Sequence, residues 1–165
     1  MFVPFNTISN DARVWIYQAS RKLTSEEYQR VVSKGRQFID NWGAHGQPLT
    51  ASIEVLLDHF IVVSVDDYLQ LPSGCSIDAS VGFIRSIGEE LQVNFFDRSL
   101  VPLWRDESIF LVPLTELKEK IKDGKIDADT TLINTLVQKK SELMNWHIPI
   151  KNSWLGRYLP QATSN

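Results

Sequence analysis

Apolar side chains in the first part of the chain alternate between the spacing of strands and the spacing of helices. Residues 13–20 are β-branched and aromatic, as is typical of a strand. Residues 28–42 place their apolar side chains on one helical face. Further along the chain, the pattern predicts strands at 49–57 and 60–67 and a helix at 77–91. An extended region at 95–104 and a strand at 109–112 come after them.

The residues before the first helical pattern contain a capping box. In Thr24-Ser25-Glu26-Glu27, the Thr24 hydroxyl can accept from the Glu27 backbone N–H while the Glu27 carboxylate accepts from that of Thr24. Gly43 marks the expected end of the helix, because glycine commonly follows the last helical turn. The sequence therefore predicts a capped helix between these positions.

The elements expected in residues 13–113 have the order β-α-β-β-α-β, followed by one more strand. This order predicts an α+β fold, a ferredoxin-like sandwich in which an antiparallel sheet carries both helices on one face. The last strand would add an extra hairpin through a turn at 105–108. Beyond Pro113 the pattern favours a helical C-terminal extension, with helices at 115–124 and 129–143 and an aromatic tail at 146–159.

Length and composition favour one hydrophobic core. The chain has 165 residues, of which 43% are hydrophobic, and this suffices for one sizeable core. We expect a single domain over residues 1–165, with an α+β core at 13–113 and the helical and aromatic extension at 114–160 packed on it.

The charge of the chain argues against nucleic acid as a partner. Seventeen basic and twenty acidic residues give a net charge of -3, and no basic stripe is present. The densest basic stretches, 118–125 and 139–140, fit solvated helix faces. We expect no nucleic-acid partner.

Cysteine usage and hydropathy indicate a cytoplasmic protein. A single cysteine forms no internal disulfide, which suits a reducing compartment. No signal peptide and no run of 18 apolar residues is evident, so we expect no membrane partner. Three histidines without ligand spacing and one cysteine predict neither a metal site nor a cofactor.

The strongest candidate for chemistry is the segment 73–78, where a strand pattern gives way to a helical one. Its residues are Ser73, Gly74, Cys75, Ser76, Ile77 and Asp78. A helix start exposes unpaired backbone N–H groups and a partial positive charge, which can hold an anion or lower the pKa of a thiol. Alternatively, Ser73 or Ser76 caps the helix, Asp78 complements its dipole, and Cys75 is a small buried residue.

His45 lies in an expected loop at 43–48, from which a side chain can project into a cleft. Two functions follow from these residues. The first is a non-catalytic module that binds a small anionic ligand or a protein partner near Ser73–Asp78, with His45 beside it. The second is a small enzyme with Cys75 as nucleophile and His45 as base. A homodimer is compatible with both.

Several segments resemble an uncharacterised family of short bacterial proteins that often carry the label "ABC transporter ATPase". The resemblance rests on VPFN and ARVWIYQA near the start, on WGAHG and SGCSID, and on NSWLGRYL near the end. The family has no established activity, so the resemblance implies a small bacterial protein and assigns no residue a role.

The ATPase label does not fit this chain. A P-loop requires G-x-x-x-x-G-K-[ST], in which the glycine-rich backbone wraps the phosphates and the lysine reaches their oxygens. The one Gly-Lys pair is Gly124-Lys125; it is followed by Ile126, and position 119 is Glu119. The sequence therefore predicts that the protein is not a P-loop ATPase.

Overall fold

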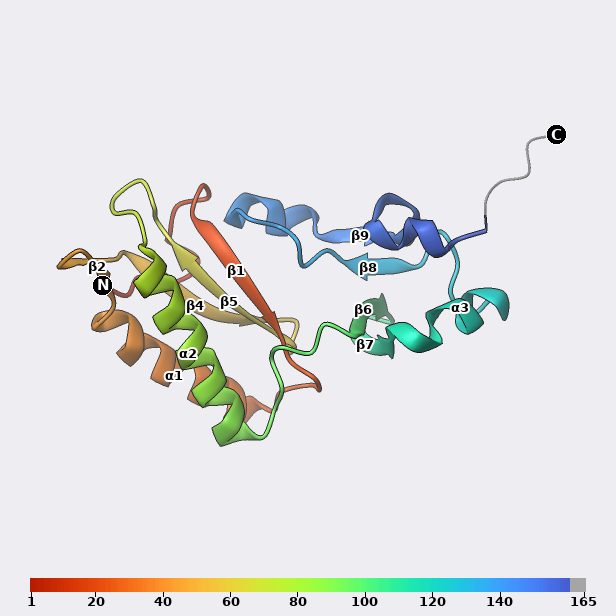
Figure 1. Ribbon diagram of the computed structural model, residues 1–165, viewed down its shortest axis with the longest axis horizontal. Coiled ribbons are helices and arrows are strands. Elements are labelled where there is room, and N and C mark those ends of the chain that lie inside the picture. Colours follow the sequence, from red (N-terminus) through yellow and green to blue (C-terminus); the bar gives the residue numbers. More distant parts are fainter. Residues whose placement is uncertain (161–165) are drawn as a thin grey trace. The chain divides into compact units, whose positions relative to one another are not determined.

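The computed structural model describes residues 1–160, which fall into two compact units (Figure 1). Unit 1 comprises Met1–Asp97 and Leu136–Met144, and unit 2 comprises Arg98–Thr135 and the residues from Asn145 onward. Residues 98–113, expected in the first core, thus belong with unit 2. The expectation that residues 1–165 act as one domain stays a prediction.

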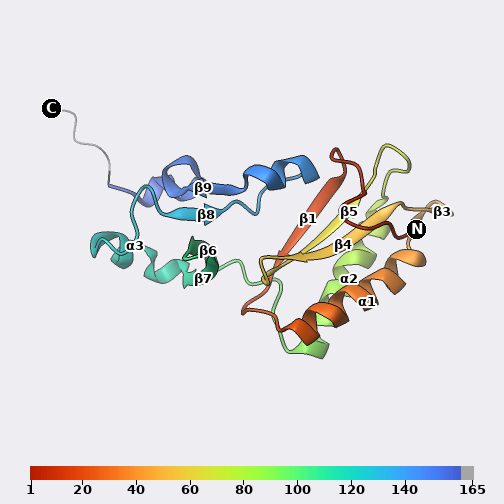
Figure 2. The ribbon, with the colours of Figure 1, turned by 180° about the vertical axis from the view of Figure 1, so that it is seen from behind.

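Unit 1 is a three-stranded antiparallel sheet with two helices on one face (Figures 1 and 2). The sheet has the order β1-β5-β4, and the β2-β3 hairpin lies outside it. The bounds of the elements are β1 Arg13–Gln18, α1 Ser25–Asp40, β2 Gly43–Ala44, β3 Gln47–Pro48, β4 Ala51–Leu56, β5 Phe60–Val65 and α2 Gly74–Leu91.

The α+β class is confirmed, but the ferredoxin-like strand order is not. A ferredoxin-like sheet would place a fourth strand on the free edge of β1. Instead β6 (Leu100–Arg105) lies in the sheet of unit 2, where β7 (Ser108–Pro113) and β8 (Thr131–Ile133) pair with it from both sides. The hairpin of β6 with β7 is the one that the sequence predicts, whereas the other edge of β6 pairs with β8, through Leu103–Leu132 and Trp104–Thr131, instead of with β1.

Each edge of the unit 1 sheet is bonded at one end by chain from elsewhere in the unit. At β1, Val14 N–H donates to Gln138 O at 3.0 Å, and Lys140 N–H donates to Ala12 O at 2.9 Å. At β4, Val3 N–H donates to Ala51 O at 2.8 Å. These contacts satisfy backbone groups that would otherwise offer an open strand edge.

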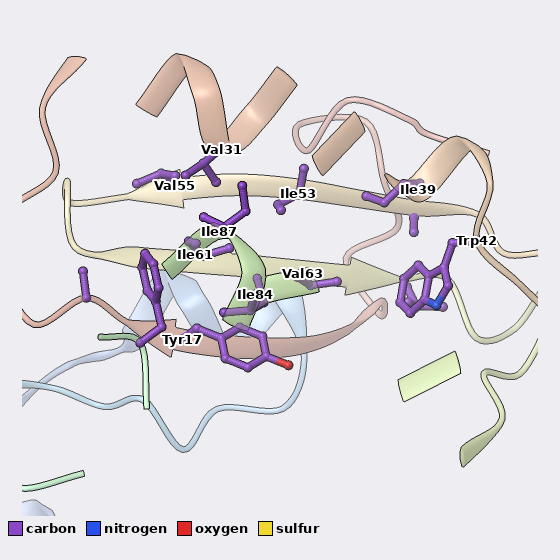
Figure 3. Packing of buried hydrophobic residues seen from close by; sticks show 14 of the residues in the cluster. Tyr17, Val31, Ile39, Trp42, Ile53, Val55, Ile61, Val63, Ile84 and Ile87 are labelled. Carbon is purple, nitrogen blue, oxygen red and sulfur yellow. The ribbon is translucent and has the colours of Figure 1, made fainter. Parts of the chain in front are cut away.

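The core of unit 1 lies between the sheet and its two helices (Figure 3). Gly35 of α1 lets the helix approach β4 closely, since a Cβ there would lie 2.7 Å from two side-chain carbons of Ile53. The side chains that meet in this layer include Tyr17, Val31, Ile39, Ile53, Ile61, Val63, Ile84 and Ile87.

The opposite face of the sheet holds two buried hydroxyls. Ser52 and Ser64 are cross-strand partners, and both are fully buried. Neither hydroxyl has a hydrogen-bond partner within the described residues. An unpaired buried polar group costs about 1–3 kcal/mol, so this pair offsets part of the stability that the core supplies.

Unit 2 is a four-stranded sheet of order β7-β6-β8-β9, with α3 (Leu114–Lys122) following β7 and β9 spanning His147–Pro149. Two short 3₁₀ turns, η2 Ile150–Asn152 and η3 Trp154–Tyr158, complete this unit, whereas a third, η1 Lys140–Asn145, lies in unit 1 up to Met144. The buried side chains of this unit are Val101, Leu103, Val112, Leu117, Ile126, Leu132, Ile150 and Leu155. The aromatic tail thus packs into this core through Ile150 and Leu155.

The prediction of a helical C-terminal extension is only partly correct. The expected helix at 115–124 is α3, but the expected helix at 129–143 is absent from the structure. Thr131 and Ile133 are β-branched and pair in β8, and the backbone of Gln138 binds β1. Long-range strand pairing therefore overrides the helical spacing of the apolar residues in this segment.

Three hairpins turn through two residues with positive φ. These residues are His45 and Gly46 between β2 and β3, Leu57 and Asp58 between β4 and β5, and Asp106 and Glu107 between β6 and β7. Positive φ at both central positions is the geometry of a type I′ turn, which matches the twist of the flanking strands. Five of these residues are not glycine, so the turn geometry arises without the Asn-Gly signal.

The capping box of α1 is confirmed. Glu27 N–H donates to Thr24 Oγ1 at 3.1 Å, and Thr24 N–H donates to Glu27 Oε1 at 2.9 Å. The helix ends at Asp40, with Asn41 after it, so the end lies slightly before the expected Gly43.

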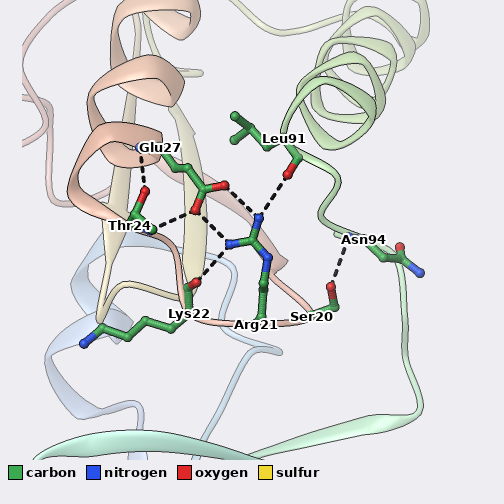
Figure 4. A network of polar contacts seen from close by, with 7 residues as sticks. All are labelled: Ser20, Arg21, Lys22, Thr24, Glu27, Leu91 and Asn94. Carbon is green, nitrogen blue, oxygen red and sulfur yellow. Dashed lines mark hydrogen bonds and ion pairs between the residues drawn. The ribbon is translucent and has the colours of Figure 1, made fainter.

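Arg21 connects the start of α1 to the end of α2 (Figure 4). Its guanidinium forms a two-pronged ion pair with Glu27, at 2.8 and 2.7 Å, and also donates to the terminal carbonyl of Leu91 at 3.0 Å. The hydrogen bond with Arg21 is the main cause that lowers the pKa of Glu27 to about 2. We call Arg21, Glu27 and Leu91 the helix clasp.

The helix clasp predicts a loss of stability in acid. The folded pKa of Glu27 lies below its ordinary value, so its contribution is present above about pH 4.5 and is lost as the pH falls towards 2. Glu27→Gln should lower the free energy of unfolding at pH 7 by about 1–2 kcal/mol and flatten its decline in acid.

Denaturant unfolding at a series of pH values measures this effect. Glu26→Gln is the matched control, because Glu26 also lies in the first turn of α1 but forms no ion pair within the described chain. Equal acid profiles for the Glu27→Gln variant and the wild type would contradict the role of the helix clasp.

Candidate functional site

The predicted site residues lie at the start of α2, which begins at Gly74 with Ser73 as N-cap. Ser76 N–H donates to Ser73 Oγ at 3.1 Å, and Ser73 N–H donates to Ser76 Oγ at 2.6 Å. Ser76 is buried, whereas Cys75 is exposed. The alternative of a buried Cys75 is therefore wrong, and the capping role falls to Ser73.

This capping arrangement occupies the Ser76 N–H, one of the N–H groups that a helix start leaves unpaired. Ser73 Oγ accepts from Ser76 N–H, and Ser73 O accepts from Ile77 N–H at 3.0 Å. Asp78 places an exposed carboxylate in the second turn, where it already complements the helix dipole. The geometry therefore gives less support to a small anionic ligand than the sequence did.

Trp42 brings together two of the motifs on which the family resemblance rests. Its indole Nε1–H donates to Ser76 O at 2.8 Å, and the side chain is 4% exposed. Phe38 packs against Trp42 and stacks on Phe83 of α2, with ring centroids 5.3 and 4.8 Å apart. The end of α1 and the start of α2 are thus fixed to each other.

His45 lies at the exposed tip of the β2-β3 hairpin, with φ of 52°. Within residues 1–160, no hydrogen bond or ion pair joins His45 to Cys75. A general base needs to lie within hydrogen-bond reach of the proton that it removes. The enzyme hypothesis, with Cys75 as nucleophile and His45 as base, therefore stays a prediction without a hydrogen-bonded pair to support it.

The other two histidines have structural surroundings. His59 is buried, and its Nδ1–H donates to Leu57 O at 3.0 Å; burial lowers its pKa. Burial also lowers the pKa of His147, whose ring meets Trp104 edge-on at 4.9 Å. In the described part of the chain, no group of three His, Cys, Asp or Glu side chains is arranged to hold a metal ion.

The loop between β5 and α2 presents large apolar side chains to solvent. Tyr68 is 95% exposed, Leu69 is 62% exposed and Leu71 is 67% exposed. The loop is nonetheless ordered at its base, because Asp66 N–H donates to Thr50 O and Asp66 O accepts from Leu69 N–H. Exposed apolar side chains clustered on one ordered loop are typical of interaction sites.

A groove of about 730 Å³ runs beside this loop. Tyr68 and Leu71 form its apolar side, and Asp66 and Asp67 lie next to them. The remaining lining residues, from other segments of unit 1, are Ser9, Asp11, Arg13, Gln138 and Lys139. We call the loop 66–73, this groove and the first turn of α2 the docking surface.

Sequence reasoning missed most of the docking surface. The sequence of segment 68–74 indicates only a loop that joins a strand to a helix. Apolar residues are generally expected in the protein interior, so nothing in this segment predicts that they are exposed. The signal that could have identified it is the density of large apolar residues, Tyr68, Leu69 and Leu71, directly before a proline and a capped helix start.

Comparison of the chain with protein-family models, curated proteins and solved structures gave no match. The resemblance to the short bacterial family therefore stays a prediction. None of the helices within residues 1–160 combines the length and the apolar composition needed to cross a membrane.

Proposed function

We propose that the protein is a non-catalytic module that binds a protein partner through the docking surface. The observation that carries this proposal is the exposure of Tyr68, Leu69 and Leu71 on one ordered loop. The partner would supply an apolar segment that packs on these side chains, next to the exposed Cys75.

A protein partner fits this surface better than a small anion does. The Ser76 N–H at the helix start is already bonded to Ser73 Oγ, and Asp78 adds negative charge there. Aromatic and leucine side chains release their hydration when another apolar surface covers them, at roughly 25 cal/mol for each Å² buried. This gain is available to a partner segment and not to a small hydrophilic anion.

The charges of the docking surface favour a partner with basic side chains. Asp11, Asp66 and Asp67 line the groove, and none of them forms an ion pair within the described chain. Of the two basic lining residues, Arg13 already lies over the Trp15 ring at 4.6 Å. Lysine or arginine side chains flanking the apolar segment would complement these carboxylates and increase the rate of association.

The single cysteine allows a direct test of this proposal. Cys75 is the only cysteine in the chain, and it is exposed beside the loop. Coupling a benzophenone maleimide to it places a photo-crosslinker at the docking surface. We expect one defined crosslinked protein in an extract of the source cells, and the purified partner should bind the unlabelled chain.

Matched variants decide whether the loop makes the contact. Tyr68→Ser/Leu71→Ser should abolish the crosslink, whereas Met144→Ser should retain it, because Met144 is 84% exposed but does not line the groove. Equal crosslinking of the two variants would contradict the proposal. Analytical ultracentrifugation provides a second test. A concentration-dependent dimer that is lost in the Tyr68→Ser/Leu71→Ser variant would contradict the proposal, because a second copy of the chain would then occupy the docking surface.

A further inference from the structure

A second surface, in unit 2, gathers positive charge around a pocket of about 660 Å³. Lys118 and Lys122 reach it from α3, and Arg157 reaches it from η3. The two lysines are four residues apart, so they lie on the same face of the helix. This pocket is separate from the docking surface and does not depend on the function proposed for it.

The three cations of this pocket have no acidic partner. None of them forms an ion pair within the described residues, and no carboxylate lines the pocket, although Glu116 and Glu119 are also in α3. Like charges spaced four residues apart on a helix repel each other. The helix dipole offsets the charge of Lys122 in the last turn, but it acts little on Lys118 in the middle.

Aromatic rings hold Arg157 in place. Its guanidinium lies over the Tyr158 ring at 5.2 Å and over the Trp154 ring at 5.7 Å. A guanidinium fixed in this way loses little further freedom when it binds, and its planar fork matches the oxygens of a phosphate. Tyr158 and Ile121 also line the pocket, which gives it an apolar wall beside the cations.

We propose that this pocket binds a small organic phosphate. The phosphate group would be held by Lys118, Lys122 and Arg157, with charge-assisted hydrogen bonds from all three. The organic part would pack on Ile121 and Tyr158. A pocket of about 660 Å³ is within the usual size range of ligand sites and exceeds what inorganic phosphate fills.

Titration of the full-length protein with phenyl phosphate, followed by amide chemical shifts in NMR, tests this site. Saturable shifts should appear at residues 118–122 and 157–159. Phenol, which lacks the charge, should give no saturable shift, and inorganic phosphate should bind more weakly than phenyl phosphate. Equal affinity for the two phosphates, or no saturable shift at these residues, would overturn the proposal.

Two charge variants separate the pocket from general surface charge. Lys118→Gln/Lys122→Gln should raise the Kd for phenyl phosphate about tenfold or more, the equivalent of about 1.4 kcal/mol. Lys120→Gln should leave the Kd unchanged, because Lys120 is in the same helix but does not line the pocket. If Lys120→Gln weakens binding as much as the double variant, the pocket is not the binding site.

Discussion

Trp42→Ala is expected to lower the free energy of unfolding by about 3–5 kcal/mol, the range for removal of a large buried aromatic side chain. Trp42 is 4% exposed and packs against Phe38. Its loss would leave a cavity between the end of α1 and the start of α2. It would also remove the donor to Ser76 O, which lies in the first turn of the helix that carries Cys75.

Denaturant unfolding of two further variants separates these contributions. Trp42→Phe keeps most of the packing but loses the indole N–H, and it should cost about 0.5–1.5 kcal/mol for the lost hydrogen bond to Ser76 O. Trp154→Ala is the control, because Trp154 is 44% exposed, and it should cost less than either Trp42 variant. A Trp42→Ala protein as stable as the control variant would show that Trp42 does not link the two helices.

Gly88→Ala is expected to destabilise unit 1 by about 1–3 kcal/mol, in the range of overpacking substitutions. A Cβ at Gly88 would lie 2.7 Å from Val93 O, a backbone atom that cannot move aside as a side-chain end can. Val93 N–H donates to Gly88 O at 2.9 Å and closes the end of α2, so the two backbones must stay close.

Gly82→Ala is the control for this substitution. Gly82 lies in the same helix, and a Cβ there would meet no atom within 4 Å. Alanine should therefore raise the free energy of unfolding by about 0.5–1 kcal/mol, because glycine loses more backbone entropy than alanine on entering a helix. In thermal or denaturant unfolding, we expect Gly88→Ala to lower the free energy of unfolding and Gly82→Ala to raise it. Changes of the same sign in the two variants would contradict the close approach at Gly88.

Local signals in the sequence predicted the elements of unit 1 well. The capping box at Thr24 and the β-branched run in β5 depend on residues close together in the chain, and both were located correctly. Either Ser73 or Ser76 was expected to cap α2, and Ser73 is the N-cap because its backbone is extended and its hydroxyl accepts from Ser76 N–H.

The errors concern pairing between distant segments. The sequence predicts the β6-β7 hairpin but not the strand on the other edge of β6, which is β8 instead of β1. The segment 129–143 has helical spacing, yet Thr131 and Ile133 pair with neighbours that are identified only once the chain is folded. The docking surface was missed for the same reason, because exposure of Tyr68 depends on what the rest of unit 1 does not cover.

Calorimetric titration of the crosslinked partner, once purified, tests the docking surface most directly. The wild-type chain should bind with an affinity that falls as salt is added, because Asp66 and Asp67 attract basic side chains. Tyr68→Ser/Leu71→Ser should weaken binding about tenfold or more at every salt concentration, since 1.4 kcal/mol corresponds to a factor of ten. Equal affinities for the wild type and the double variant would contradict the account.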